Sequence, residues 1–215
     1  MTKPIRLGVL LSGGGRTLQN LLDHIDRGQL PAEVVVVIAS SAGTKGEERA
    51  RARSIATYVV KPSDFPTVEA FSAATSARLD TAQVDLVCLA GFMFLWQIPP
   101  QYTGRVMNIH PALIPSFCGH KMYGHHVHEA VLQYGAKVSG CTVHFADDQY
   151  DHGPIVLQGV VPVLDDDTPE ALASRVHTLE NELYPEAVRL WAAGRLDVVG
   201  RRVRIRPGSV LSPES

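Results

Sequence analysis

The sequence alternates short apolar runs with longer amphipathic stretches through its first half, and this alternation limits the folds open to the chain. A short apolar run between turn residues is typical of a buried strand, whereas apolar residues three and four positions apart are typical of a helix. The pattern predicts strands at residues 5–11, 34–38, 57–60 and 86–90, and helices at residues 18–25, 46–55 and 68–79. Strands separated by helices form parallel sheets, so we expect an α/β fold with a Rossmann-like, doubly wound, mostly parallel sheet.

The second half of the sequence predicts an extension of this sheet. A strand at residues 106–110 is followed by Pro111 and Pro115, which end regular structure. The later elements are expected to be a helix at residues 125–134, strands at 138–145 and 155–163, a helix from Thr168 to about 193, and a hairpin at 196–205. The turn-rich stretch between the two later strands indicates an antiparallel extension. We therefore expect one domain over residues 1–195, followed by a C-terminal hairpin and frayed tail at residues 196–215.

The composition favours a globular protein with a small-molecule ligand. The chain has 215 residues, of which 45% are hydrophobic and 20% are charged, and its formal net charge is −2. This balance does not provide the broad basic surface that nucleic-acid binding needs. Three cysteines without a CxxC pair predict neither a disulfide framework nor a zinc ribbon. Because no secretion signal or bilayer-length apolar run is recognisable, we expect a cytoplasmic protein without a membrane partner; whether it forms a homodimer is left open.

A glycine-rich turn, SGGGRT at residues 12–17, joins the first predicted strand to the first predicted helix. It is not the GxGxxG of dinucleotide-binding proteins, because Leu18 occupies the third glycine position, and it lacks the lysine of a P-loop. Backbone N–H groups at such a turn favour an anion, and an arginine and a threonine at the helix start suit a phosphomonoester. A purely structural tight turn is the alternative. The residues expected to contact the phosphate are Gly13, Gly14, Gly15, Arg16 and Thr17.

Three polar residues in the second half predict a catalytic site. Asn108 and His110 lie two positions apart at the end of a predicted strand, so their side chains point to the same face. An amide can donate to a developing oxyanion, and an imidazole can pass a proton near neutral pH. Asp151 lies in the turn between the two later strands, and each residue alone also suits ordinary turn chemistry. Their combination with a phosphate-type loop favours a site at the carboxyl ends of the strands.

A histidine-rich stretch follows these residues. It contains Cys118, His120, His125, His126 and His128. A zinc site needs ligands at set spacings with supporting partners, and no carboxylate lies in register here. We expect no metal at this stretch, and interpret it as a helix start or a mobile lid.

Several separated segments resemble the phosphoribosylglycinamide formyltransferases, the folate-dependent GAR transformylases. The motifs are NIHPALIP at residues 108–115, GCTVHF at 140–145, DHGPIVLQ at 151–158, LAGFM at 89–93, and the stretch from Arg175 through Glu180 to Tyr184-Pro185. The resemblance covers residues 5 to about 195. It implies formyl transfer, without a metal, from 10-formyltetrahydrofolate to the primary amine of 5-phosphoribosylglycinamide in de novo purine synthesis.

The resemblance also implies roles for individual residues. Asn108 is implied to hold the formyl oxygen, and His110, helped by Asp151, to move the proton between the amine and the folate nitrogen. Glu180 is implied to contact the ribose hydroxyls. The residues implied to line the folate side are Phe92, Met93, Phe94, His144, Ala146, Asp147 and Tyr150.

The chain departs from the family pattern at the glycine loop, which usually reads Ser-Gly-x-Gly-Ser-Asn, and at Phe94, where an arginine is common. An arginine often found near the start of the third helix is replaced within residues 66–68. We expect Arg16 to supply positive charge lost elsewhere, because a guanidinium suits a phosphate. The departures keep open another formyl acceptor, either an amino sugar nucleotide or water, as in formyltetrahydrofolate deformylase. A ligand sensor or metal-binding module and a hydride-transferring oxidoreductase are less favoured.

Overall fold

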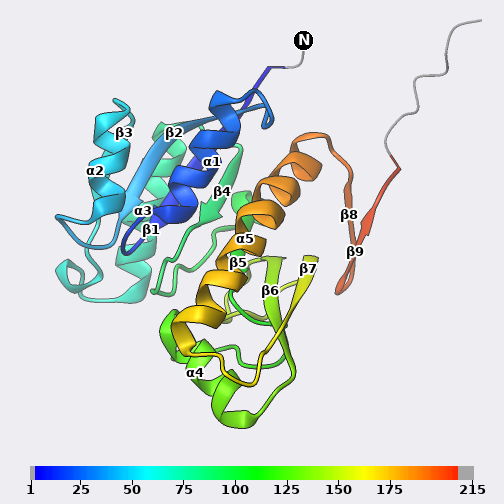
Figure 1. Cartoon of the computed structure of the whole chain (residues 1–215). Helices are drawn as coiled ribbons and strands as arrows, with labels where there is room; N and C mark the ends of the chain where they lie inside the picture. The colour runs from blue at the N-terminus through cyan, green and yellow to red at the C-terminus, as the bar shows by residue number, and fades with distance from the viewer. Residues whose placement is uncertain (1–2, 208–215) are drawn as a thin grey trace, which may run out of the picture.

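The described residues, 3–207, form one nine-stranded sheet in the computed structural model (Figure 1). Its strands are β1 (Ile5–Leu11), β2 (Ala32–Ala39), β3 (Ala56–Val59), β4 (Leu86–Leu89), β5 (Val106–His110), β6 (Val138–Phe145), β7 (Ile155–Pro162), β8 (Leu196–Val199) and β9 (Arg202–Ile205). The helices are α1 (Arg16–Asp26), α2 (Lys45–Ala52), α3 (Val68–Thr81), α4 (His125–Tyr134) and α5 (Pro169–Ala192), with 3₁₀ turns η1 (Pro62–Asp64) and η2 (Pro100–Tyr102). The tail predicted at residues 208–215 lies outside the described residues.

The first five strands are parallel and doubly wound, which confirms the predicted fold class. The sheet order is β3-β2-β1-β4-β5-β6-β7-β9-β8, so the chain builds outward from β1 in one direction and then returns to place β4 on its other side. A crevice at the carboxyl ends of the strands forms where the winding direction changes, and ligands of such sheets bind there. The glycine loop follows β1 at this point.

Helices cover both faces of the parallel half, and two hydrophobic clusters result. One cluster joins β1 to α1, α2 and α5 through residues such as Leu18, Ala50 and Val176. The other cluster lies between α3 and the opposite face of the sheet, and it contains Phe71 and Leu79 of α3. Because both faces are covered, the inner strands are apolar on both sides, and this explains their uninterrupted apolar runs in the sequence.

The later strands form the antiparallel extension that the sequence predicts. β6 runs antiparallel to β5 and to β7. The predicted C-terminal hairpin is present as β8 and β9, and β9 pairs with β7 at Ile155 and Arg202. The hairpin therefore extends the same sheet at its far edge (Figure 1).

The long helix α5 crosses from the extension to the parallel half and fixes both to each other. It begins as the sequence predicts, with the Thr168 hydroxyl accepting a hydrogen bond from the Ala171 N–H and Pro169 in the first turn. The fully buried Tyr184 hydroxyl lies 3.1 Å from the Leu89 carbonyl oxygen and 2.9 Å from that of Met107. These contacts hold α5 against the ends of β4 and β5, next to Asn108.

Candidate active site

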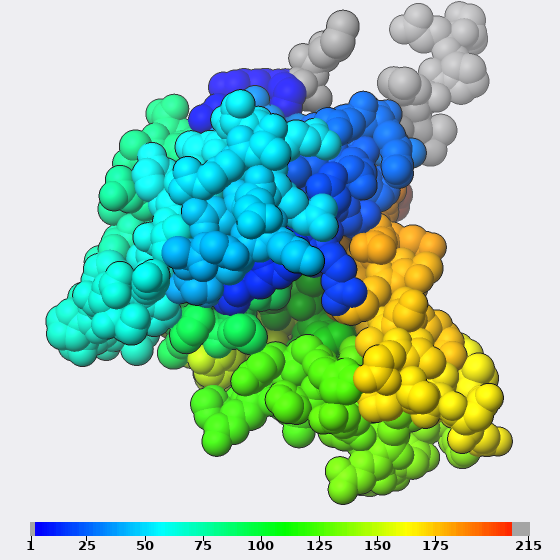
Figure 2. Space-filling view, turned by 60° about the vertical axis from the view of Figure 1, so that its left-hand side comes forward, coloured from blue at the N-terminus to red at the C-terminus, as the bar shows by residue number. Residues whose placement is uncertain are grey.

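The polar residues predicted from the sequence meet at the carboxyl end of β5. Asn108 and His110 lie on this strand, and the pairing of β5 with β6 places Asn108 opposite His144. Asp151 comes from the loop between β6 and β7, which returns to the same strand ends. Figure 2 shows the surface hollowed between the blue and cyan first half of the chain and the green and yellow later half.

The side chains of Asn108, His110 and Asp151 are in direct contact. Asn108 Nδ2 donates to Asp151 Oδ1 at 3.2 Å, and His110 Nδ1 lies 3.3 Å from Asp151 Oδ2. The His110 side chain is 4% exposed and that of Asp151 10% exposed, so these charges are screened little by solvent. The structure therefore brings together the three residues that the sequence grouped.

The environment of His110 keeps one ring nitrogen free to take a proton. Its Nε2 lies 2.8 Å from the Phe117 carbonyl oxygen, which can only accept, so Nε2 carries a hydrogen. Burial lowers the pKa of His110, and the opposing effects of Asp151 and the Phe117 carbonyl are too small to cancel it. The neutral ring then presents an unprotonated Nδ1 to Asp151, and a proton arriving there forms an ion pair.

Asn108 uses both of its amide hydrogens inside the site. Besides Asp151, Nδ2 contacts His144 Nε2 at 3.1 Å. His144 Nδ1 lies 2.9 Å from the Phe145 carbonyl oxygen, so this nitrogen carries the hydrogen and Nε2 accepts. His144 is thereby an orienting partner of Asn108, and its ring is nearly fully buried.

Asp151 is ionised in this setting. Burial raises the pKa of its carboxyl group, but the neighbouring rings of His144 and His110 and the Gly119 N–H at 2.9 Å outweigh burial and lower the pKa below its usual value. Its backbone φ of 53° lies in the left-handed region that few residues other than glycine adopt. The surrounding contacts therefore hold Asp151 in an uncommon backbone conformation.

The glycine loop presents a helix N-terminus without a side-chain cap, as an anion site requires. Gly15 has φ 67°, and a Cβ there would lie 2.5 Å from the Gly46 Cα, so only glycine fits between the loop and α2. Gly13 and Gly14 are exposed beside it, and Thr17 is in the first turn of α1. The loop geometry is compatible with the predicted anion site.

The structure adds His177, which the sequence did not predict as a site residue. Arg16 Nη2 lies 2.7 Å from His177 Nε2, and His177 Nδ1 lies 2.7 Å from Glu180 Oε2. A guanidinium only donates, so His177 Nε2 accepts and its Nδ1–H donates to the carboxylate. His177 precedes Glu180, the residue expected to contact the ribose, by one helical turn of α5. This spacing was the one sequence feature that could have indicated His177.

Of the residues expected on the folate side, His144 is buried in β6, and the others are half-exposed or exposed and lie in two segments. Phe92 and Phe94 make an edge contact with ring centroids 6.2 Å apart, and the Met93 N–H donates to the Ser12 hydroxyl, next to the glycine loop. In the second segment, the Ala146 N–H donates to the Val106 carbonyl, while Tyr150 lies against His120. Asp147, in the same segment, has Oδ2 2.7 Å from His152 Nδ1.

Within the histidine-rich stretch, His125, His126 and His128 lie at the start of α4, one of the two interpretations that the sequence offered, whereas Cys118 and His120 precede this helix. His125 and His126 both lie near Glu129, one turn later, and His128 is buried. Within residues 3–207 there is no cluster of three or more side chains that could ligate a metal ion. The same residues contain no helix long and apolar enough to cross a membrane.

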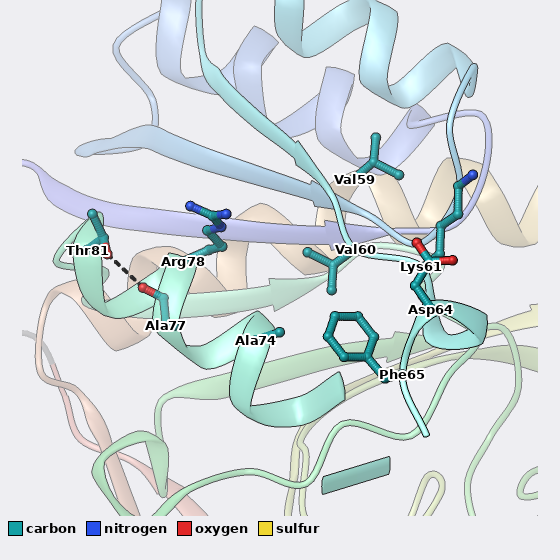
Figure 3. A pocket seen from close by; sticks show the side chains of 9 residues that line it. All are labelled: Val59, Val60, Lys61, Asp64, Phe65, Ala74, Ala77, Arg78 and Thr81. Carbon is teal, nitrogen blue, oxygen red and sulfur yellow. Dashed lines mark hydrogen bonds between the residues drawn. The ribbon is translucent and has the colours of Figure 1, made fainter. Parts of the chain in front are cut away.

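A separate pocket of about 300 Å³ lies at the opposite edge of the sheet, between β3, η1 and α3 (Figure 3). Val60, Phe65 and Ala74 line it, with Lys61 and Arg78 on either side. None of its lining residues belongs to the site predicted from the sequence. The converging acid, imidazole and amide groups at β5 therefore identify the better candidate for chemistry.

Comparison with known proteins identifies the family of this chain. Residues 5–188 match the family described as formyl transferase. The chain is 42% identical over 195 residues to the trifunctional purine biosynthetic protein adenosine-3 of Drosophila pseudoobscura pseudoobscura, covering 89% of this chain but only 14% of that protein. It is 37% identical over 190 residues to the phosphoribosylglycinamide formyltransferase of Escherichia coli (strain K12), covering 87% of each.

Solved structures show the same relation. Glycinamide ribonucleotide transformylase 1 from Symbiobacterium toebii superposes with a TM-score of 0.88 at 45% identity, covering 96% of each chain. A formyltetrahydrofolate deformylase from Pseudomonas syringae pv. tomato shares the fold at a TM-score of 0.83 but with 24% identity over 67% of that chain. The extent of the family match and the identity to full-length relatives lead to one conclusion: this chain belongs to the formyl transferase family.

Proposed function

We propose that the chain transfers the formyl group of 10-formyltetrahydrofolate to the primary amine of 5-phosphoribosylglycinamide, a step of de novo purine synthesis. The observation that carries the proposal is the contact of one carboxylate, Asp151, with both the Asn108 amide and the His110 imidazole. Formyl transfer needs a donor for the formyl oxygen and a path for one proton, and these residues provide both. The names of the related proteins support the same reaction.

The folate co-substrate supplies the formyl group, and the protein supplies hydrogen bonding and proton transfer. As the amine nitrogen bonds to the formyl carbon, the carbonyl electron pair moves onto the formyl oxygen. The amine then loses one proton, and the folate nitrogen gains one when its bond to the carbon breaks. The reaction therefore needs a group that can take up and return a proton, and no net oxidation occurs.

Asn108 is the donor to the formyl oxygen in this proposal. Both of its amide hydrogens are already bonded, to His144 and Asp151, so substrate binding exchanges one of these bonds for one to the oxygen. An oriented oxyanion donor typically stabilises the transition state by about 2.7–4 kcal/mol. The remaining bond keeps the amide in position while the charge develops.

His110 carries the proton in this proposal. Its lowered pKa keeps it neutral at pH 7, so it can accept a proton, and Asp151 then stabilises the imidazolium. A positioned acid–base group of this kind contributes about 10²- to 10⁴-fold to the rate. Asp151 also orients the ring, because its own carboxylate is fixed by the Gly119 N–H.

The phosphoribosyl part of the acceptor is assigned to the glycine loop and α5. Gly13, Gly14, Gly15 and Thr17 offer N–H and hydroxyl groups to the phosphate at the α1 N-terminus. Arg16 adds a guanidinium that moves from His177 to the phosphate, and Glu180 accepts from the ribose hydroxyls.

The folate is assigned to the segments at residues 92–94 and 146–150. Phe92, Phe94 and Tyr150 present aromatic faces with partial exposure, which suits a flat heterocyclic ring. Met93 is 45% exposed and can pack against the same ring, and Ala146 leaves space beside it. His144 and Asp147 complete this side from the β6 strand and its following loop.

Transfer to another acceptor is the second candidate, because Arg16 and Thr17 replace the family's usual loop residues. Water as acceptor would make the chain a deformylase, and the deformylase neighbour shares the fold alone. An amino sugar nucleotide would also present a phosphate and an amine. These reactions differ from the proposed one in whether 5-phosphoribosylglycinamide is required.

One assay separates these functions. Purified protein is mixed with 10-formyltetrahydrofolate, and the change in folate absorbance is followed with and without 5-phosphoribosylglycinamide. We expect turnover only with the acceptor and its loss in Asn108→Ala, with the fold retained by circular dichroism. Equal turnover without the acceptor identifies a deformylase, and no turnover in either mixture refutes formyl transfer to this amine.

We also propose a cytoplasmic location, a reducing compartment in which cysteine thiols stay free. The thiols of Cys88, Cys118 and Cys141 are all free, and Cys88 and Cys141 are buried. Burial raises the pKa of both buried thiols to about 12, so they remain unreactive in a reducing compartment. Localisation of a tagged full-length chain tests this proposal.

A further inference from the structure

The C-terminal hairpin lies beyond the part of the chain that matches the family, which ends at residue 188. It pairs with β7 through Ile155 and Arg202, next to the loop that carries Asp151 (Figure 1). Leu196 and Val203 pack against the main hydrophobic cluster, so the hairpin is anchored to the body of the protein. Its turn is thereby held at a fixed place beside residues 146–154.

Arg201, at this turn, contacts His152, the residue that follows Asp151. Its Nη2 donates to the His152 carbonyl oxygen at 2.7 Å, and its Nη1 lies 3.0 Å from His152 Nε2. One planar guanidinium thus bonds both the backbone and the ring of the same residue. Such two-point contacts define orientation as well as distance.

The contact with Arg201 determines which ring nitrogen of His152 carries a hydrogen. Because a guanidinium only donates, His152 Nε2 is an acceptor and its Nδ1 carries the hydrogen. This Nδ1 lies 2.7 Å from Asp147 Oδ2, while Asp147 Oδ1 accepts from the Gln149 N–H at 3.0 Å. Arg201, His152 and Asp147 therefore form a continuous chain of hydrogen bonds that closes the loop on itself.

The loop needs outside support at this place. Asp151 has a left-handed backbone, and Gly153 packs so closely that a Cβ would lie 1.9 Å from the Phe145 carbonyl oxygen. On its other side, Asp148 accepts a hydrogen bond from the Ile98 N–H at 3.2 Å. Asp151 thus lies between one anchor near Ile98 and one on the hairpin.

We propose that Arg201 is a positioning residue for the formyl-transfer site: by holding His152, it fixes the loop that presents Asp151 to Asn108 and His110. This inference rests on the proposed function for its catalytic consequence. Arg201 and His152 are both exposed, and exposed pairs contribute little to global stability. We therefore expect the loss of Arg201 to make the loop at residues 146–153 more mobile and to slow the chemical step.

The test compares Arg201→Ala with Arg201→Lys and with the control Arg204→Ala, which removes an exposed arginine from the same hairpin. Amide hydrogen exchange of residues 146–153 is measured together with kcat and the KM values for both substrates. We expect Arg201→Ala to accelerate exchange about tenfold and to lower kcat about 10- to 100-fold, because small misplacements of catalytic groups have effects of this size. The KM values and the unfolding temperature stay near those of the wild type.

Arg201→Lys is expected to give intermediate values, because one ammonium cannot reproduce the fixed fork of a guanidinium. Equal exchange and equal kcat in Arg201→Ala and Arg204→Ala overturn the proposal. Faster exchange with unchanged kcat, or lower kcat with unchanged exchange, also overturns it. If the wild-type chain transfers no formyl group, the proposed function fails separately, and exchange alone decides whether Arg201 holds the loop.

Discussion

Replacing Asp151 by asparagine tests the central contact of the site with almost no change in shape. The carboxylate accepts from the Asn108 amide and the Gly119 N–H and faces the His110 ring. In asparagine one of the two oxygens becomes an NH₂ group. Whichever oxygen is replaced, a donor then faces a donor, and the charge that stabilises a protonated His110 is lost.

The expected loss follows from these contacts. Hydrogen bonds to a charged group contribute about 1.5–3 kcal/mol each, so two of them amount to about 3–6 kcal/mol. On the rate scale, where about 1.4 kcal/mol is tenfold, this corresponds to a fall in kcat of roughly 10²- to 10⁴-fold. The pH dependence changes too: the Asp151 charge raises the pKa of His110, so removing it lowers that pKa further.

The assay is the formyl-transfer rate as a function of pH. We expect the acidic limb of the wild-type kcat profile below pH 6.5, the ordinary value for histidine, because burial lowers the pKa of His110. In Asp151→Asn this limb moves to still lower pH and the plateau falls. Asp148→Asn is the matched control, since this exposed residue in the same loop can still accept from Ile98 through its amide oxygen. An Asp151→Asn rate within twofold of this control refutes the reasoning.

Three further predictions use other parts of the structure. Arg16→Ala is expected to raise the KM for 5-phosphoribosylglycinamide roughly 10- to 100-fold, with kcat little changed. Steady-state kinetics measure both constants, with Arg27→Ala as the control variant. Equal KM values in the two variants contradict a phosphate contact by Arg16. Tyr184→Phe removes the donor shared by two buried carbonyls, and its free energy of unfolding in urea should fall by about 1–3 kcal/mol; an unchanged value argues against that bond. Burial and then the neighbouring His177 lower the pKa of His128 to about 4. The unfolded chain therefore binds a proton first as the pH falls from about 6.5 towards 4, and stability decreases over that window by about 3 kcal/mol. Urea unfolding of His128→Gln should lose this part of the slope, and an identical slope would count against it.

Some of the site was predictable because its residues carry strong local signals. Asn108 and His110 alternate on one strand before a proline, and Asp151 belongs to a turn, so their types and spacing indicated chemistry before any contact was known. His177 gave only a weak signal, because a histidine on a helix is common and its bond to Arg16 joins residues 161 positions apart. The role of Arg201 was equally hidden, since arginines recur throughout the hairpin and only one of them reaches His152.

The sequence by itself determined the strands, the helices and their alternation, because apolar periodicity and capping residues act between neighbours a few positions apart. It also determined that the fold class is α/β, since strands separated by helices pack in few ways. The tertiary structure alone decided which side chains share a proton network, how Asp151 is held against His110, and that the C-terminal hairpin lies beside the catalytic loop. Those outcomes depend on packing between segments distant in the chain, and spacing along the sequence carries no record of it.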